Sequence, residues 1–149
     1  MSDPPHLFFS AGNSRQVAIS MRHEGWDVFG RRLETPNLCL DLDRFEANLA
    51  TMASTIAAHQ KQWRPHSKCH KSPEIARRQM AAGAIGVTCA KVSEAEIFAQ
   101  VGIRDILIAH IPVGPTRIDR ITELCKSADV IVTCYNYAQA EPLSAACRD

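Results

Sequence analysis

The sequence lacks an excess of charge of either sign, and it lacks any long hydrophobic run. Its 149 residues carry 17 basic and 16 acidic side chains, for a formal net charge of +1. This balance gives no electrostatic support for binding to nucleic acid or to a membrane surface. The apolar runs are a few residues long, whereas a membrane-spanning helix needs about 20, and Leu7-Phe8-Phe9 is too short for the core of a signal peptide. We therefore expect a cytoplasmic protein with no nucleic-acid or membrane partner.

The cysteines also lack the spacing of a disulfide framework. Four of the six lie in or beside apolar, strand-like runs, namely Cys39, Cys69, Cys89 and Cys134. Thiols in such positions are typical of reduced, partly buried cysteines in a cytosolic protein. The cysteine pattern therefore agrees with the predicted compartment.

No Gly-x-Gly-x-x-Gly motif follows any predicted strand, so a dinucleotide-binding fold has no support. Strand-like runs begin at residues 63, 85, 105 and 130, and helical segments separate them. Short apolar strands that alternate with helices are typical of a parallel sheet covered on both faces. The pattern predicts an α/β fold and favours a (β/α)8 barrel of the TIM type over an open doubly wound sheet. Because a complete barrel has about 250 residues, we expect a partial barrel, about its first half.

The stretch before the first strands has no regular period. Proline and glycine interrupt residues 1–34, so we predict a loose N-terminal arm there with at most one short helix. Residues 35–149 are predicted to form the barrel domain.

Three helix starts are predicted from capping residues. Ser72-Pro73-Glu74 combines an N-cap serine, a proline at the first helical position and an acidic first turn. Ser93-Glu94-Ala95-Glu96 has the spacing of a capping box, and so does Asn136 with Gln139.

The densest group of reactive side chains is the octapeptide Arg64-Pro65-His66-Ser67-Lys68-Cys69-His70-Lys71. It lies at the carboxyl end of the first predicted barrel strand, where barrel enzymes carry their active sites. On a strand, Arg64, His66 and Lys68 share one face. A lysine near other cations loses its proton more readily, and the neutral amine is the form that attacks an aldehyde. The alternative is a basic loop that is simply solvated.

Other candidates are weaker. His66, Cys69 and His70 match no closed zinc pattern, so no metal site is predicted in this chain. Lys91 and His110 end the second and third strands and face either the barrel mouth or solvent.

The octapeptide matches every fixed position of Arg-Pro-His-x-Lys-x-His-Lys, the N-terminal motif of the D-threonine aldolase/D-serine dehydratase family. Thr35-Pro36, residues 40–43, Ile75-Ala76 and residues 83–87 also resemble that family, and the similarity extends over about residues 35–140. These enzymes are fold-type III, alanine-racemase-like proteins that use pyridoxal 5'-phosphate (PLP).

The resemblance implies a PLP-dependent lyase, an aldolase or dehydratase acting on a D-hydroxy-amino acid such as D-threonine, D-serine or 3-hydroxyaspartate. Lys68 corresponds to the lysine that forms the Schiff base with PLP, and Lys71 is the alternative. Arg64 and His66 are implied to support the lysine or to bind the cofactor. Residues 35–149 are then a partial PLP-binding, alanine-racemase-like barrel domain. The full-length parent is implied to be a homodimer, with a divalent metal (Mn or Zn) whose ligands are not in this chain.

Two alternatives stay open at this point. The chain is an inactive fragment or a non-catalytic PLP-binding protein, or its parent is an amino-acid racemase, since racemases share this half of the barrel. His70-Lys71 favours the aldolase and dehydratase branch. We expect little or no turnover from the 149-residue chain alone.

Overall fold

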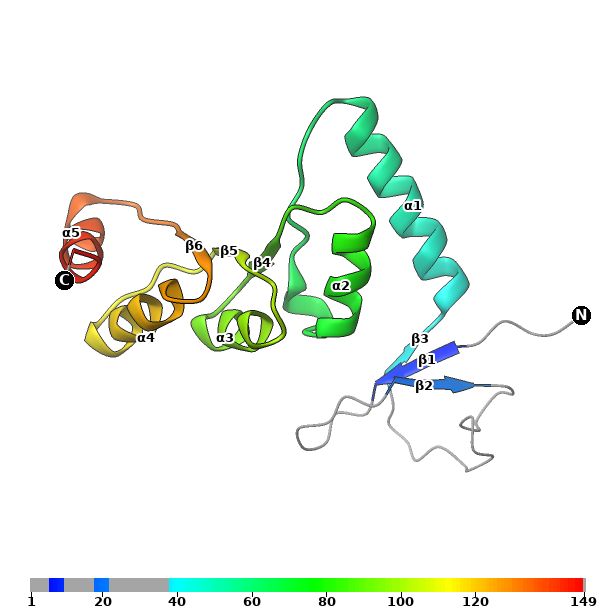
Figure 1. Cartoon of the computed structure of the whole chain (residues 1–149), viewed down its shortest axis with the longest axis horizontal. Helices are drawn as coiled ribbons and strands as arrows, with labels where there is room; N and C mark the ends of the chain where they lie inside the picture. Colours follow the sequence, from blue (N-terminus) through cyan, green and yellow to red (C-terminus); the bar gives the residue numbers. More distant parts are fainter. Residues whose placement is uncertain (1–5, 10–17, 22–37, 149) are drawn as a thin grey trace, which may run out of the picture. The chain divides into compact units, whose positions relative to one another are not determined.

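The computed structural model describes residues 6–9, 18–21 and 38–148 (Figure 1). The chain divides into two units, residues 1–55 and 56–149. Among the described helices, none combines the length and the apolar character that crossing a membrane requires.

The first unit contains an antiparallel sheet with strand order β2-β1-β3. Strands β1 (His6–Phe9) and β2 (Ala18–Met21) pair with each other, and β1 also pairs with β3 (Leu38–Leu40). The sequence analysis predicted no strand in residues 1–34, and the expected short helix is not among the residues described there. The difference arises because strand pairing depends on partners distant in sequence, which a local period does not reveal.

Helix α1 (Leu42–Ala58) follows β3 and crosses the boundary between the units. The Asp41 carboxylate accepts a hydrogen bond from the Arg44 amide at 3.0 Å, which caps the helix start. Leu42 and Leu49 are buried, seven residues apart on one helical face.

The second unit is the α/β part of the chain. Its parallel sheet has the order β4-β5-β6, formed by Val87–Cys89, Asp105–Ile108 and Asp129–Val132. Helices α3 (Val92–Gln100) and α4 (Pro115–Cys125) connect these strands in sequence. Helix α2 (Pro73–Ala81) precedes β4, and α5 (Tyr137–Ala146) follows β6. Parallel strands that alternate with helices confirm the predicted partial barrel.

Residues 63–66 run beside β4 and extend the parallel sheet at its edge. The Trp63 and Pro65 carbonyl oxygens accept hydrogen bonds from Ile85 and Thr88 amides, at 3.1 and 2.8 Å. His66 forms a parallel bridge with Thr88. The predicted first strand is therefore present as a single bridge with flanking bonds, and it ends earlier than predicted, because Ser67–Cys69 forms a 3-10 turn, η1.

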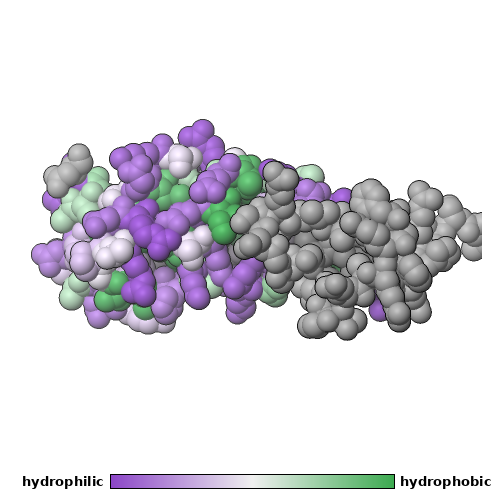
Figure 2. All heavy atoms as spheres, turned by 90° about the horizontal axis from the view of Figure 1, so that it is seen from below, coloured by the Kyte–Doolittle hydropathy of each residue, from purple (hydrophilic) through white to green (hydrophobic). Residues whose placement is uncertain are grey.

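The core of this unit lies between the sheet and its helices. Helix α3 contacts β4 and β5, and α4 contacts α3, β6 and α5. Fully or almost fully buried side chains fill the interface, among them Val87, Cys89, Ala95, Phe98, Ile106 and Ile108. On the face shown in Figure 2, hydrophilic residues predominate over the described part of the chain.

The helix starts test the capping predictions. Ser72 is the N-cap of α2 and accepts from the Ile75 amide, and Asn136 caps α5 in the same way through the Gln139 amide. The prediction for α3 is wrong: the helix begins at Val92, two residues earlier than an N-cap at Ser93 implies, with Lys91 as an N-cap that makes no side-chain bond. The carboxylate of Glu94 instead accepts from the Ala90 amide, so it satisfies a donor just before the helix.

Candidate functional site

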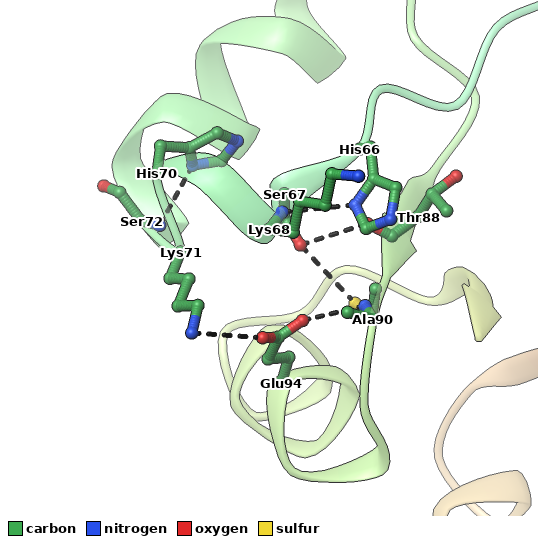
Figure 3. Close-up of polar contacts among 10 residues, drawn as sticks. His66, Ser67, Lys68, His70, Lys71, Ser72, Thr88, Ala90 and Glu94 are labelled. Carbon is green, nitrogen blue, oxygen red and sulfur yellow. Dashed lines mark hydrogen bonds and ion pairs between the residues drawn. The ribbon is translucent and has the colours of Figure 1, made fainter. Parts of the chain in front are cut away.

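The candidate site lies at the carboxyl end of the sheet, where two loops meet. Turn η1 follows the edge segment 63–66, and Ala90 follows β4. The octapeptide supplies the first loop and Glu94 reaches the second, as Figure 3 shows.

Ser67 fixes the octapeptide to β4. Its side chain is fully buried, and its hydroxyl donates to the Thr88 carbonyl oxygen at 3.0 Å and lies 3.8 Å from the Cys89 sulfur. The Thr88 hydroxyl in turn donates to the Arg64 carbonyl oxygen at 2.9 Å. These bonds hold the turn that carries Lys68 against a buried strand.

Lys68 is exposed in this turn, as is the neighbouring Cys69. Its backbone amide donates to Nδ1 of His66 at 3.2 Å, which fixes the start of η1. Within the described part of the chain, no hydrogen bond or ion pair holds its ammonium group. Lys68 therefore combines a fixed backbone with a side chain available to a ligand.

Lys71 differs from Lys68 because its ammonium is engaged. Its Nζ lies 3.4 Å from Oε1 of Glu94, while Oε2 of Glu94 accepts from the Ala90 amide at 2.8 Å. The Glu94 side chain is only 9% exposed. Sequence analysis placed Glu94 in a capping box and missed this contact, because a first-turn glutamate carries no local sign of a distant cation.

His70 lies between these lysines and is half-buried. Its Nδ1 accepts from the Ser72 amide at 3.0 Å. Its Nε2 is buried and has no hydrogen-bond partner among the described residues. Burial lowers the pKa of His70 below its ordinary value, since desolvation disfavours the charged ring.

Arg64 points away from the Lys68 turn. Its Nε and Nη2 donate to the two carboxylate oxygens of Asp105, at 2.5 and 2.9 Å. Asp105 is the first residue of β5, so the pair lies toward the amino end of the sheet, opposite the loops. The hydrogen bonds that Arg64 donates to the Asp105 carboxylate raise the pKa of the Arg64 guanidinium.

Gly86 lies between the partners of this ion pair. The register aligns Val87 with Ile106 and Thr88 with His66, which places Gly86 between Asp105 and Arg64. A Cβ atom at Gly86 would overlap the carbonyl oxygen of Asp105 and would lie 2.6 Å from the Oδ1 atom of the Asp105 side chain. The absent side chain therefore lets the ion pair cross β4.

The site offers a free amine for a cofactor and no evident cluster for a metal within the described residues. An exposed amine on a fixed turn fits the aldehyde end of PLP, whereas the Arg64 guanidinium is already bound. Lys91 and His110 are exposed and follow β4 and β5. Within residues 6–9, 18–21 and 38–148, no group of three metal-ligating side chains comes together.

Comparison with known proteins gives consistent matches. Residues 40–149 match the family described as alanine racemase, N-terminal domain. The chain is 47% identical over 105 residues to a D-threonine aldolase of Arthrobacter sp, and 40% identical over 108 residues to a 3-hydroxy-D-aspartate aldolase of Paracoccus denitrificans. These alignments cover 70% and 72% of this chain but only 28% of each relative.

A solved structure is similar as well. The crystal structure of D-threonine aldolase from Filomicrobium marinum superposes with a TM-score of 0.76 at 45% identity, over 78% of this chain and 31% of that one. The chain therefore spans less than a third of the length of each of these three relatives.

Proposed function

Because the chain belongs to the alanine racemase N-terminal domain family, we propose that it forms part of the PLP-binding barrel of a lyase that acts on D-hydroxy-amino acids, with Lys68 as the covalent anchor. The observation that carries this proposal is the Lys68 ammonium. It has no partner among the described residues, and it stands on a turn fixed to β4, inside the octapeptide.

When bound, PLP supplies an electron sink for cleavage at the amino acid. Three residues of this chain, Lys68, His66 and Ser67, have roles in this proposal. The Lys68 amine would hold the cofactor at its aldehyde carbon, and His66 holds the Lys68 amide. The Ser67 hydroxyl keeps the turn at the end of β4.

For Arg64 we propose an indirect role instead of a cofactor contact. Its guanidinium makes two bonds to Asp105 at the amino end of the sheet. A side chain held there supports the edge segment 63–66, which leads into the turn that carries Lys68, and so acts on the site only through the fold.

Aldolases and a dehydratase are both among the relatives, so the reaction proposed for the whole protein is aldol cleavage, which breaks a carbon–carbon bond, or dehydration. D-threonine and 3-hydroxy-D-aspartate are the substrates we propose, by analogy with the names of these relatives. A homodimer, a divalent metal bound outside this chain, a cytoplasmic location and a domain boundary near residue 34 stay predictions.

The test is cofactor binding, because little turnover is expected from the chain alone. Purified chain is mixed with PLP, its absorbance is recorded, and borohydride is added before digestion and mass spectrometry. We expect an absorbance band near the visible edge and a reduced PLP adduct on Lys68. Lys68→Ala should lose both, while Lys61→Ala, which removes another exposed lysine, should retain them.

An adduct spread over all surface lysines, with Lys68→Ala unchanged, contradicts the proposal. Circular dichroism of each variant checks that the fold is intact. An assay for aldehyde release from D-threonine by the full-length protein distinguishes a racemase from an aldolase. Racemisation inverts the substrate without releasing an aldehyde, whereas aldol cleavage of D-threonine releases one.

A further inference from the structure

The buried carboxylate of Glu94 links the two loops of the candidate site. One oxygen accepts from the Ala90 amide just after β4, and the other faces the Lys71 ammonium at the end of the octapeptide. Both oxygens are thus used, and both partners belong to loops at the carboxyl end of the sheet. A carboxylate this buried is stable only when it is paired in this way.

The backbone at Lys71 supports a specific arrangement. Lys71 has a φ of 49°, an uncommon conformation for a residue with a side chain. Its amide donates to the Ser67 carbonyl oxygen at 2.7 Å. The turn therefore closes tightly and directs the Lys71 side chain toward Glu94, as Figure 3 shows.

The two lysines of the octapeptide consequently have different surroundings. The Lys68 ammonium has no partner among the described residues, whereas Lys71 is held by Glu94. Attack on an aldehyde needs a neutral amine, whose lone pair forms the carbon–nitrogen bond while the carbonyl oxygen leaves as water. An ammonium in an ion pair must first leave its partner and lose a proton.

We propose that Glu94 is a positioning residue that decides which lysine of the octapeptide reacts: it retains Lys71 as a bound ammonium and leaves Lys68 to take the aldehyde. This inference rests on the proposed function, in which Lys68 is the anchor. Glu94 touches neither cofactor nor substrate in this role, and acts through Lys71 and the Ala90 loop.

The test compares Glu94→Gln with Glu96→Gln. Glutamine at 94 retains an oxygen for the Ala90 amide but removes the charge that holds Lys71. Glu96 lies on the same helix and pairs with Arg120 on the surface, so Glu96→Gln makes the same chemical change away from the site. Circular dichroism checks that both variants fold.

Two reagents are used on each protein. Acetic anhydride acylates any neutral amine, and PLP followed by borohydride, whose hydride reduces the carbon–nitrogen double bond, marks the lysine that takes the aldehyde. Mass spectrometry gives the ratio of label on Lys71 to label on Lys68. We expect this ratio to rise about fivefold in Glu94→Gln, the size expected for the loss of one ion pair, and to stay constant in Glu96→Gln.

The outcomes separate the two proposals. An acylation ratio that is equal in Glu94→Gln and the unmodified chain overturns the role of Glu94, even if PLP still marks Lys68. Equal changes in both variants also overturn it, since a general charge effect then explains the shift. If the acylation ratio changes only in Glu94→Gln but PLP marks neither lysine, the control of Lys71 by Glu94 is supported and the proposed cofactor anchor fails.

Discussion

The ion pair between Arg64 and Asp105 provides a quantitative test of what Arg64 does. Arg64→Met keeps most of the aliphatic stem but removes the charge, and Asp105→Asn keeps the shape of the acceptor. With the double variant they form a thermodynamic cycle, whose coupling energy isolates the pair from other effects of each substitution.

The structure sets the expected magnitude. Exposed ion pairs contribute about 0.2–1 kcal/mol, and hydrogen bonds to charged groups about 1.5–3 kcal/mol. The Arg64 and Asp105 side chains are 27% and 33% exposed and make two hydrogen bonds. They lie between these cases, so we expect a coupling of about 1–2 kcal/mol.

Urea unfolding followed by circular dichroism measures the four free energies of unfolding. The pair Glu123–Lys126 is the control, because both side chains are more than two thirds exposed, and its coupling should stay below about 0.5 kcal/mol. A coupling of the Arg64 pair below about 0.3 kcal/mol would refute the structural role. Arg64 would then be available for the cofactor, as the family resemblance first implied.

Three further predictions concern neighbouring residues. Gly86→Ala should lower the free energy of unfolding by about 1–3 kcal/mol in urea titrations, because its Cβ overlaps Asp105; unchanged stability would contradict the register. Burial raises the pKa of the Cys89 thiol from 9.0 to about 11. At pH 8, iodoacetamide should therefore alkylate Cys89 at least about a hundredfold more slowly than exposed Cys69, as measured by mass spectrometry. Similar alkylation rates for the two thiols would contradict the burial of Cys89. Burial lowers the pKa of His70 from 6.5, so the stability that neutral His70 contributes is present above about pH 6.5 and is lost as the pH falls. In urea titrations, His70→Asn should reduce the loss of unfolding free energy between pH 7.5 and 5. An unchanged pH dependence in this variant would contradict the burial of His70.

Local sequence signals predicted the elements of the second unit well. Strands β4, β5 and β6 are short and apolar, and helices with Ser72 or Asn136 as N-cap begin where these residues indicate. Such signals act within a few residues, through backbone geometry and side-chain bonds to nearby amides. The start of α3 was misplaced because Glu94 bonds the Ala90 amide, so the apparent cap at Ser93 is not used.

Contacts between distant residues were not predicted. The sheet formed by β1, β2 and β3 joins segments that are distant in sequence, and two of them, β1 and β2, lie in residues 1–34, where the sequence has no regular period. At the candidate site, sequence analysis grouped Arg64 with Lys68 by alternation along a strand, but the strand ends at His66 and the 3-10 turn changes the direction of Lys68. Only the tertiary arrangement brings Asp105 to Arg64 and Glu94 to Lys71.

The hydrogen bonds of His66 and His70 also determine where each neutral ring carries its proton. In both rings Nδ1 accepts from a backbone amide, that of Lys68 or Ser72. The proton of each neutral ring is therefore on Nε2, which leaves that nitrogen as a donor without a lone pair to offer. While these turns persist, neither histidine can serve as a general base, so in the proposed aldol cleavage a group other than His66 and His70 removes the hydroxyl proton.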